Sequence, residues 1–446
     1  MRLRQVLDEI QQSALAAVDP CKAVLSFLRR ENDHLSIDGQ NYALSDRRVL
    51  LVGAGKAAAP MAQAVETILG DQLEKGMVIV KYGHVARLQK TIVLEGAHPE
   101  PDEAGCQAAQ TLLAFLQDNL SPKDLLLVVI SGGGSALLPV PVKEITFEEK
   151  RQTTSLLLQS EASIQEINTI RKHLSQVKGG RMLDYTGGAQ LLVLLLSDVV
   201  GDDLATIASG PASPDPTTFR QCTEIIQRLG LQEELPESVS RYLNAGADNQ
   251  GPKETPKPGD SRFDRVHHVI VGSNIKALQA AAKKAQGLGF TPLILSDSIT
   301  GNTTEAARMH VAIARQVLKT GDPLPPPCCL ISGGETTVRL IGEGKGGRNQ
   351  EFALCCAREI ADWNHTKVLF SSLGSDGTDG PTDAAGAVAS PETACLAAAK
   401  GLSIQDYLDR NDSYHFFQEV GGLITTGPTL TNVMDLRFVL IDLESG

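Results

Sequence analysis

Short apolar runs that end in glycine-rich loops recur along the chain. Such runs cover residues 49–52, 125–130, 269–271, 328–331 and 368–370, and a cluster of small residues follows each one. Apolar runs of this length between turn residues are typical of buried strands. Because helical patterns alternate with them, we predict an α/β fold whose parallel strands end at a common edge, where ligands bind. One glycine-rich loop would be an ordinary α/β turn, whereas five favour a site.

Two stretches carry clear helix signals. Val6, Ile10, Ala14 and Ala17 keep helical spacing and predict an amphipathic helix near the N-terminus. Residues 163–180 are predicted to form a second helix, with a capping box at Ser163 and Glu166 and an end at Gly179-Gly180. A polar row lies beside its apolar stripe: Asn168, Arg171, Ser175 and Lys178. This row faces either a cleft or water, and both interpretations stay open.

A polar, proline-bearing stretch at residues 246–262 has no apolar periodicity and is the clearest boundary in the sequence. A chain of 446 residues is long enough for two domains, each with its own core. We therefore expect a first domain over residues 1–250 and a second over residues 263–446. The stretch at 322–327, DPLPPP, is expected to be a stiff connector inside the second domain.

The composition narrows the classes of partner. The formal net charge is −12, aromatic residues make up 4% of the chain, and there is no run of Lys or Arg. Nucleic-acid binding and binding to an anionic membrane are therefore not expected. The 8 cysteines include no C-x-x-C pair and are expected to be buried free thiols. With no signal-peptide pattern and no apolar run near ~20 residues, the sequence predicts a cytoplasmic protein.

The segment at 331–352 combines glycines with charged groups. It opens with Gly333-Gly334-Glu335, continues with a second glycine cluster at 342–347, and reaches Arg348-Asn349. Glycines let backbone N–H groups approach an anion, and an arginine adds a planar set of donors. Asn349 and Glu351 are expected to orient the Arg348 guanidinium. This pattern predicts a phosphate or carboxylate site.

The loop after the first apolar run is a further candidate. Gly53-x-Gly55-x-x-Ala58 fits the dinucleotide fingerprint only formally, because the next strand ends in Lys81 where an acid should hold the ribose. Lys56 stands where a helix begins, and the helix dipole disfavours a cation there unless an anion binds too. Lys56 is therefore a candidate ligand of phosphate or substrate, with a solvated surface lysine as the alternative.

Acids also follow buried strands. Asp198 comes after the apolar run at 191–196, and Asp376 lies in the loop at 374–380 that follows the run at 368–370. Both are candidates for metal binding or proton transfer, although the second loop lacks the spacing of a calcium loop. His98 precedes a proline, and its role is open between structural and catalytic. Ser131 and Ser135 have no G-x-S-x-G context, so a hydrolase triad is not supported.

Several blocks, read in order from about Ala17 to the C-terminus, resemble one family. They are GAGKAAAPMA, GAHPEPDEAG, SGGGSALLP, INTIRKHLSQVKGGR, LSDVVGDD, IASGP, GGET, GKGGRNQE, NDS and GPTLTNVMD. The sequence is similar to the glycerate kinases with a C-terminal MOFRL domain, which are glycerate 2-kinases, some of them named hydroxypyruvate reductases. The resemblance implies two α/β domains, an N-terminal Rossmann-like α/β/α domain and a C-terminal α/β MOFRL domain, with the active site in the cleft between them.

The resemblance also implies an activity, the ATP-dependent phosphorylation of D-glycerate at its 2-hydroxyl to give 2-phospho-D-glycerate and ADP. The lysine and the arginine regarded as catalytic in the family fall on Lys56 and Arg348, and the acids placed in the family's site fall on Asp198 and Asp376. All four are the expected catalytic residues. In our hypothesis the two cations neutralise the γ-phosphate and the glycerate carboxylate, in an order that stays open. Asp198 or Asp376 would hold Mg²⁺. The expected contacts to ATP or substrate come from Gly53, Gly55, Ser131, Gly132, Gly133, Gly134, Ser135, Gly333, Gly334, Glu335 and Asn349.

Alternatives remain at this point. One is an NAD-dependent hydroxypyruvate reductase, another is a kinase that forms 3-phosphoglycerate, and a third is a non-catalytic anion-binding module. The expected partners are small molecules, D-glycerate and ATP, and a homodimer is one open oligomeric state. Residues 298–302 read SITGN where the family often carries a Gly-Glu pair, so a role for that loop stays open.

Overall fold

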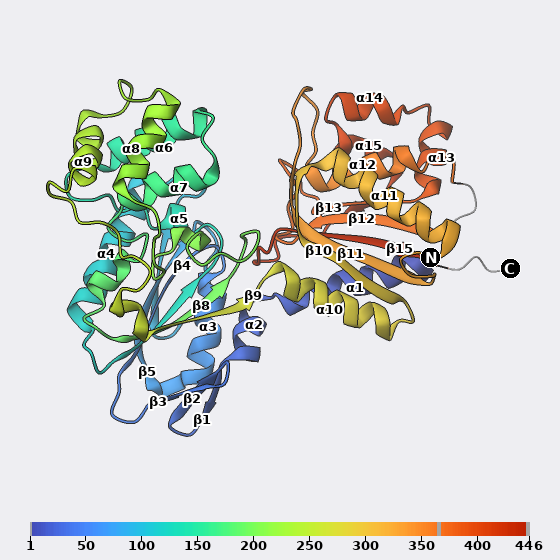
Figure 1. The fold of residues 1–446 in the computed structure, drawn as a ribbon. Helices are drawn as coiled ribbons and strands as arrows, with labels where there is room; N and C mark the ends of the chain where they lie inside the picture. Colours follow the sequence, from blue (N-terminus) through green and yellow to red (C-terminus); the bar gives the residue numbers. More distant parts are fainter. Residues whose placement is uncertain (1, 364–366, 443–446) are drawn as a thin grey trace. The chain divides into compact units, whose positions relative to one another are not determined.

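The computed structural model describes residues 2–363 and 367–442. The chain forms two compact units. The first, here called the N-terminal unit, covers residues 20–271, and the second, the C-terminal unit, combines residues 1–19 with 272–446. Each unit consists of a sheet with helices packed on it (Figure 1), so the expected two-part α/β architecture is confirmed.

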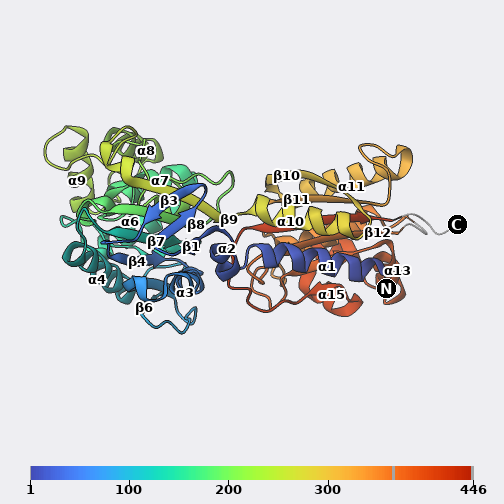
Figure 2. The ribbon, with the colours of Figure 1, turned by 90° about the horizontal axis from the view of Figure 1, so that it is seen from below.

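The limits of these units differ from the expected 1–250 and 263–446 at two places. Helix α1 (Arg2–Ala17) packs along α10 (Asn274–Gly287) and so belongs to the C-terminal unit (Figure 2). Leu7, Ile10 and Ala14 are buried, whereas Val6 of the predicted stripe is part-buried and Ala17 is exposed. Gln11 Nε2 donates to Ser371 Oγ at 2.6 Å. Strand β9 (Val266–Gly272), expected to open the second half, is instead the edge strand of the first sheet.

The N-terminal sheet has the strand order of a Rossmann fold. Its order is β6-β5-β4-β7-β8-β9, which is 3-2-1-4-5-6 in chain order. The strands are β4 (Val49–Ala54), β5 (Leu73–Lys81), β6 (Thr91–Gly96), β7 (Leu125–Ile130) and β8 (Gln190–Leu196), all paired in parallel. Helices α3 (Ala58–Leu69) and α4 (Glu103–Asn119) pack on this sheet. The order reverses between β4 and β7, and ligands bind at such a reversal.

A helical layer adds to the N-terminal unit. Helices α6 (Phe147–Gln159), α7 (Ile164–His173), α8 (Phe219–Leu229) and α9 (Glu237–Ala247) pack around one apolar core. The helix predicted over 163–180 is correct at its capping box but ends at His173. It ends early because the chain turns to pair with the segment before α6: Ser175 forms a bridge with Pro141, and the Gln176 N–H donates to Val140 O at 3.2 Å.

The C-terminal sheet is mixed, which corrects the expectation of parallel strands throughout. Its order is β10-β11-β15-β12-β13-β14. The strands are β10 (Thr291–Asn302), β11 (Cys328–Thr337), β12 (Val368–Gly374), β13 (Gly386–Ala389), β14 (Leu423–Ile424) and β15 (Asp435–Ile441). β15 runs antiparallel to both β11 and β12. β11 and β12 are therefore parallel to each other, and their carboxyl ends lie at one edge, on either side of the start of β15.

The remaining elements complete the two units. They are α2 (Pro20–Phe27), β1 (Arg29–Glu31), β2 (His34–Ile37), β3 (Gln40–Ala43), η1 (Gly70–Gln72), α5 (Gly134–Leu137), η2 (Arg181–Tyr185), η3 (Ile207–Ser209), η4 (Ser261–Arg265), α11 (Thr303–Thr320), α12 (Arg348–Glu359), α13 (Pro391–Ala399), α14 (Ile404–Asp409) and α15 (Ser413–Val420). Strands β1 to β3 form a separate antiparallel sheet.

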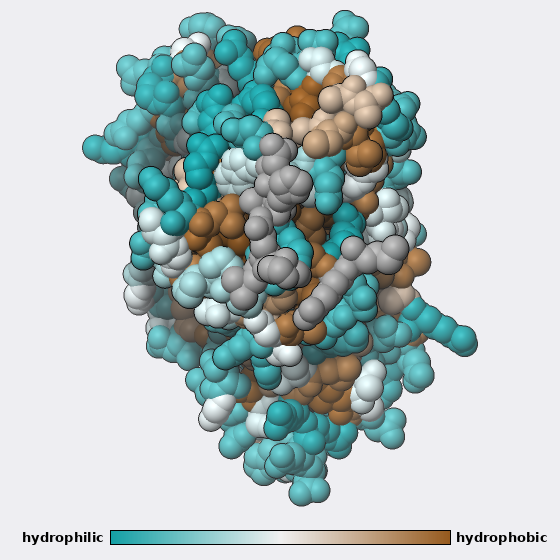
Figure 3. Space-filling view, turned by 90° about the vertical axis from the view of Figure 1, so that its right-hand side faces the viewer, coloured by the Kyte–Doolittle hydropathy of each residue, from teal (hydrophilic) through white to brown (hydrophobic). Residues whose placement is uncertain are grey.

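Much of the visible surface is hydrophilic, and most of the cysteines are buried free thiols, as expected. Hydrophilic side chains cover much of the face seen in Figure 3, with apolar groups between them. None of the described helices has both the length and the apolar character needed to cross a membrane. The cysteines are free, and most are buried, while Cys395 is exposed.

Candidate active site

The loops that follow β4 and β7 are joined by hydrogen bonds. The two strands lie side by side, with Ala54 opposite Ile130. Beyond them the Lys56 N–H donates to Gly132 O at 2.9 Å, and the Ala57 N–H donates to Ser131 Oγ at 2.9 Å. Lys56 therefore lies at the strand-order reversal, immediately before α3, as its position in the sequence predicts.

The glycines of this region are explained by close packing. A Cβ on Gly53 would collide with Val129, and one on Gly55 would collide with the Ser131 hydroxyl. Gly55 also has a φ of +135°, a conformation that favours glycine. In a dinucleotide site the second glycine leaves room for a pyrophosphate. Here the Ser131 hydroxyl occupies that space. The glycines that match the fingerprint therefore allow close packing against β7 and the loop after it.

Three polar side chains gather around Gly132 and Gly133. A Cβ on Gly132 would collide with the Asp198 carboxylate, and one on Gly133 would contact both His98 and Lys56. Burial, and after it the charge of Lys56, lower the pKa of His98 to about 4. The imidazole is therefore neutral at pH 7. The structure thus brings Lys56, Asp198 and the Ser131–Ser135 loop together, and it adds His98.

Ser135 connects this loop to a buried lysine. Lys178 Nζ donates to Ser135 O at 2.5 Å and to Ser135 Oγ at 2.9 Å. Ser135 Oγ also lies 2.9 Å from Ser209 Oγ, which in turn donates to Asn168 Oδ1 at 3.4 Å. Asn168 and Lys178 belong to the polar row beside the apolar stripe of the predicted helix. Both are buried and hydrogen-bonded, so these two members of the row do not face water.

In the C-terminal unit Arg348 is the first residue of α12 and is held by two acids. Its Nε donates to Asp435 Oδ2 at 2.7 Å, and its Nη1 lies 2.9 Å from Glu335 Oε1. The pKa of Arg348 is raised: burial acts against the charge, but Asp435 and Glu335 outweigh it. Asp435 is fully buried and also accepts from Arg437 Nη2 at 3.1 Å.

The expected orientation of this guanidinium by Asn349 and Glu351 is wrong. Asn349 Nδ2 donates instead to Asp379 Oδ1 at 3.2 Å and to Asp435 Oδ1 at 2.9 Å. Glu351 Oε2 accepts from Asn411 at 3.2 Å. Asn349 thus holds the other oxygen of the Asp435 carboxylate, and two acids distant in sequence, Asp435 and Glu335, contact the guanidinium directly.

Asp379 caps α12 and was not singled out by its sequence context. Its carboxylate accepts from the N–H groups of Asn349 at 3.0 Å and Gln350 at 2.8 Å. Burial raises the pKa of Asp379 to about 6, against the effect of these two donors, and the charge of Asp435 adds to the rise.

Asp376, the acid that the sequence favoured in this loop, is part-exposed. Its Oδ1 accepts from the Thr378 N–H at 3.0 Å in a local turn.

The glycines before Arg348 are also occupied by the chain itself. A Cβ on Gly333 would collide with Asn274, and one on Gly334 with the backbone of Ile299. In the second cluster, Gly342 and Gly344 lie against the Arg410 backbone, while the Gly347 Cα faces Asp379. These glycines permit close chain packing, so an anion is not needed to explain them. Residues 298–302, whose role was open, are the last residues of β10.

The candidate residues therefore form two sets. Lys56, Asp198 and the loop after β7 lie in the N-terminal unit, and Arg348, Glu335 and Asn349 lie in the C-terminal unit. Within the described residues, no group of three or more His, Cys, Asp or Glu side chains is placed to hold a metal ion. Sequence reasoning missed Asp379 and Asp435 as polar groups of this region, although GPTLTNVMD ends in Asp435.

Comparison with known families accounts for both parts of the chain. The family described as a domain of unknown function, DUF4147, matches residues 6–244, and the MOFRL family matches residues 328–435. A glycerate 2-kinase of Pyrococcus horikoshii is 38% identical over 447 residues, covering 100% of this chain and 99% of the relative.

Two further relatives extend the comparison. A D-glycerate 2-kinase of Thermotoga maritima is 40% identical over 440 residues, or 98% of either chain. The crystal structure of the glycerate kinase from that organism superposes with a TM-score of 0.87 over 99% of both chains. A protein of Agrobacterium vitis that carries the name hydroxypyruvate reductase is 40% identical over 98% of this chain and 94% of its own length.

Proposed function

We propose a reaction for this chain on the premise that it belongs to the glycerate kinase family built from the DUF4147 and MOFRL regions. The proposed reaction is the ATP-dependent phosphorylation of D-glycerate at its 2-hydroxyl, with 2-phospho-D-glycerate and ADP as products. One observation carries it: full-length similarity to D-glycerate 2-kinases coincides with Lys56 and Asp198 gathered around Gly132-Gly133.

Lys56 is the proposed partner of the transferring phosphate. It lies before α3, where the N-terminal end of the helix attracts anions, and beside the glycine-rich loop after β7. Phosphoryl transfer asks a protein mainly for positioning and for neutralisation of charge on the phosphate oxygens. Lys56, a half-buried residue at this position, would supply both.

Asp198 is proposed to orient the 2-hydroxyl that attacks the phosphate. Its carboxylate lies against the Gly132 backbone, next to the loop that joins Lys56. In a loose transition state the hydroxyl needs only partial deprotonation, so one carboxylate that accepts its hydrogen bond is sufficient. His98, which lies beside Gly133, is neutral at pH 7 and adds no positive charge to this loop.

Mg²⁺ is proposed as the ion that accompanies ATP. Carboxylate oxygen suits it, and Mg²⁺ sites commonly use one or two carboxylates together with substrate phosphates and waters. Asp198 fits that pattern, since a full cage of protein ligands is not required. When bound, the ion neutralises charge on the phosphate oxygens. Asp376 as a second ligand and Arg348 as a phosphate or carboxylate ligand stay predictions.

The NAD-dependent hydroxypyruvate reductase remains the second candidate because the sheet has the Rossmann order and one relative carries that name. Two observations disfavour it. β5 ends in Lys81, where an acid should hold the ribose, and Ser131 fills the space beside Gly55.

A pair of assays separates the two functions. Purified protein is mixed first with ATP, Mg²⁺ and D-glycerate while ADP release is followed, and then with NADH and hydroxypyruvate while nicotinamide absorbance is followed. We expect ADP release that depends on D-glycerate and no change in nicotinamide absorbance. Loss of that absorbance without ADP release would sink the kinase proposal.

A further inference from the structure

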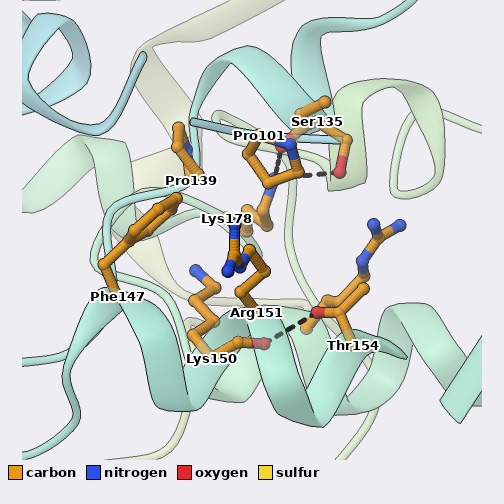
Figure 4. A pocket seen from close by; sticks show the side chains of 10 residues that line it. Pro101, Ser135, Pro139, Phe147, Lys150, Arg151, Thr154 and Lys178 are labelled. Carbon is orange, nitrogen blue, oxygen red and sulfur yellow. Dashed lines mark hydrogen bonds between the residues drawn. The ribbon is translucent and has the colours of Figure 1, made fainter. Parts of the chain in front are cut away.

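A small pocket of the N-terminal unit is lined by four cations. Lys150, Arg151, Arg171 and Lys178 line it together with Ser135 and Thr154, and none of the described lining residues carries a carboxylate. Figure 4 shows Lys150 and Lys178 reaching it from different elements. The space inside it is only about 20 Å³, little more than the ~10–15 Å³ that one water molecule needs, so it suits a group the size of a carboxylate. A small anion fits this pocket better than a nucleotide does.

Two of the cations are buried and have only neutral partners. Lys150 is 6% exposed and donates to Val140 O at 3.1 Å, and Lys178 is 2% exposed and donates to Ser135. Burial lowers the pKa of Lys150 to about 7, helped by Arg171, and it lowers the pKa of Lys178 well below the ordinary value. A buried lysine without an opposite charge tends to lose its proton, so an arriving anion would favour the charged forms of Lys150 and Lys178 and be stabilised by them.

The neighbouring lysine shows the contrast. Lys172, next to Arg171 on α7, is buried as well, but it lies 3.4 Å from the buried carboxylate of Asp215. Within the described part of the chain, Lys150, Arg171 and Lys178 have no carboxylate within salt-bridge distance. The fold therefore pairs Lys172 with a buried carboxylate, whereas the buried lysines that line the pocket, Lys150 and Lys178, are left to pair with a ligand.

We infer that this pocket binds the carboxylate of the acid substrate, an inference that rests on the proposed function. Ser135, which holds Lys178, closes the same loop whose Gly133 faces Lys56. A substrate anchored there by its carboxylate would place its hydroxyl toward the loop that carries the proposed catalytic groups. In this assignment the pocket lysines bind the substrate carboxylate, and Lys56 binds the transferring phosphate.

Lysine-to-methionine variants test the assignment. Lys150→Met and Lys178→Met keep a long apolar stem and remove the charge, and Arg171→Gln offers a third variant at a half-buried position should either fail to fold. Lys143→Met, at an exposed position before α6, is the matched control. We expect the KM for D-glycerate to rise on the order of 10- to 100-fold in the pocket variants, with the KM for ATP unchanged and the control like the wild type.

Other outcomes would overturn the inference. A rise in the KM for ATP alone would mean that the pocket holds phosphate, and unchanged constants would make the cations purely structural. Calorimetry without ATP separates this question from the reaction. Wild-type protein should bind D-glycerate more tightly than its neutral amide, and the variants should lose that preference. If wild-type protein shows the preference but releases no ADP, the proposed function fails while the pocket stands; equal binding of acid and amide sinks the pocket.

Discussion

The Arg348 guanidinium donates through Nε to the buried carboxylate of Asp435 at 2.7 Å, and Glu335 takes its Nη1. Both contacts depend on the planar, forked geometry of the guanidinium, which an ammonium group cannot reproduce. We therefore expect Arg348→Lys to lower kcat/KM by 10-fold or more, about 1.4 kcal/mol, although the charge is kept. Arg358→Lys, on the same helix and paired at the surface with Glu359, is the control and should change little. Near-full activity in the Arg348 variant would show that charge alone suffices.

Asp435 also neutralises the buried Arg437. Asp435→Asn should destabilise the fold by about 3–5 kcal/mol, because breaking a buried pair leaves an uncompensated charge. Denaturant unfolding of the variant and the wild type measures this difference. Asp376→Asn is the comparison, since that carboxylate is part-exposed in a local turn, and it should change stability by less than about 1 kcal/mol while lowering activity. Equal stability of the two variants would contradict the shared-carboxylate account.

Lys56→Ala should abolish most turnover and leave the fold intact. The charge of Lys56 helps only a bound anion, because its position at the start of α3 is otherwise unfavourable for a cation. We expect kcat to fall on the order of 10²-fold or more, by analogy with the loss of one transition-state donor, and the Tm to stay unchanged. Lys123→Ala, at an exposed position before β7, controls for the loss of a lysine. An unchanged kcat would mean that Lys56 is a solvated lysine with no role in the reaction.

His98 reports whether Lys56 lies where the structure has it. The pKa of His98 is about 4, lowered by burial and then by Lys56, against 6.5 for an ordinary histidine. Between pH 6.5 and about 4 the unfolded chain binds a proton at this histidine that the folded chain does not bind. The contribution of His98 to the free energy of unfolding is therefore lost as the pH falls through that window. NMR titration should show the His98 pKa rising in Lys56→Ala.

His268 is the internal control for this titration. Its pKa is also about 4 and burial is again the main cause, but Lys56 does not contribute to the shift, so His268 should not respond to the substitution. A His98 pKa near 6.5 in the wild type, or equal shifts at both histidines, would contradict the placement of Lys56.

Local patterns predicted the elements that carry the proposed reaction. The apolar runs before Gly53, Ser131 and Asp198 are β4, β7 and β8, which are adjacent in one parallel sheet. Parallel strands end at the same edge, so these residues had to meet once the strands paired. The helix position of Lys56 followed from the same local signals.

Distant pairing could not be predicted in this way. β15 enters the C-terminal sheet between β11 and β12, and only that insertion brings Asp435 to Arg348. The local sequence likewise does not reveal that the helix ends at His173 and that Lys178, predicted to lie on the same helix, is buried in the segment after it. Lys150 lies in an acidic stretch that looks like a solvated helix face, yet it is buried. Each miss depends on how segments pack together, which the local pattern does not contain.

Phosphorus NMR of the reaction product tests the central claim most directly. The protein is incubated with ATP, Mg²⁺ and D-glycerate, and the proton-coupled spectrum of the phosphorylated acid is recorded. A phosphate on the 2-hydroxyl couples to the single proton at that carbon and gives a doublet, which is the predicted result. A triplet from the two protons of the terminal carbon would show 3-phosphoglycerate and contradict the 2-kinase proposal, and an unchanged ATP spectrum would contradict the kinase activity altogether.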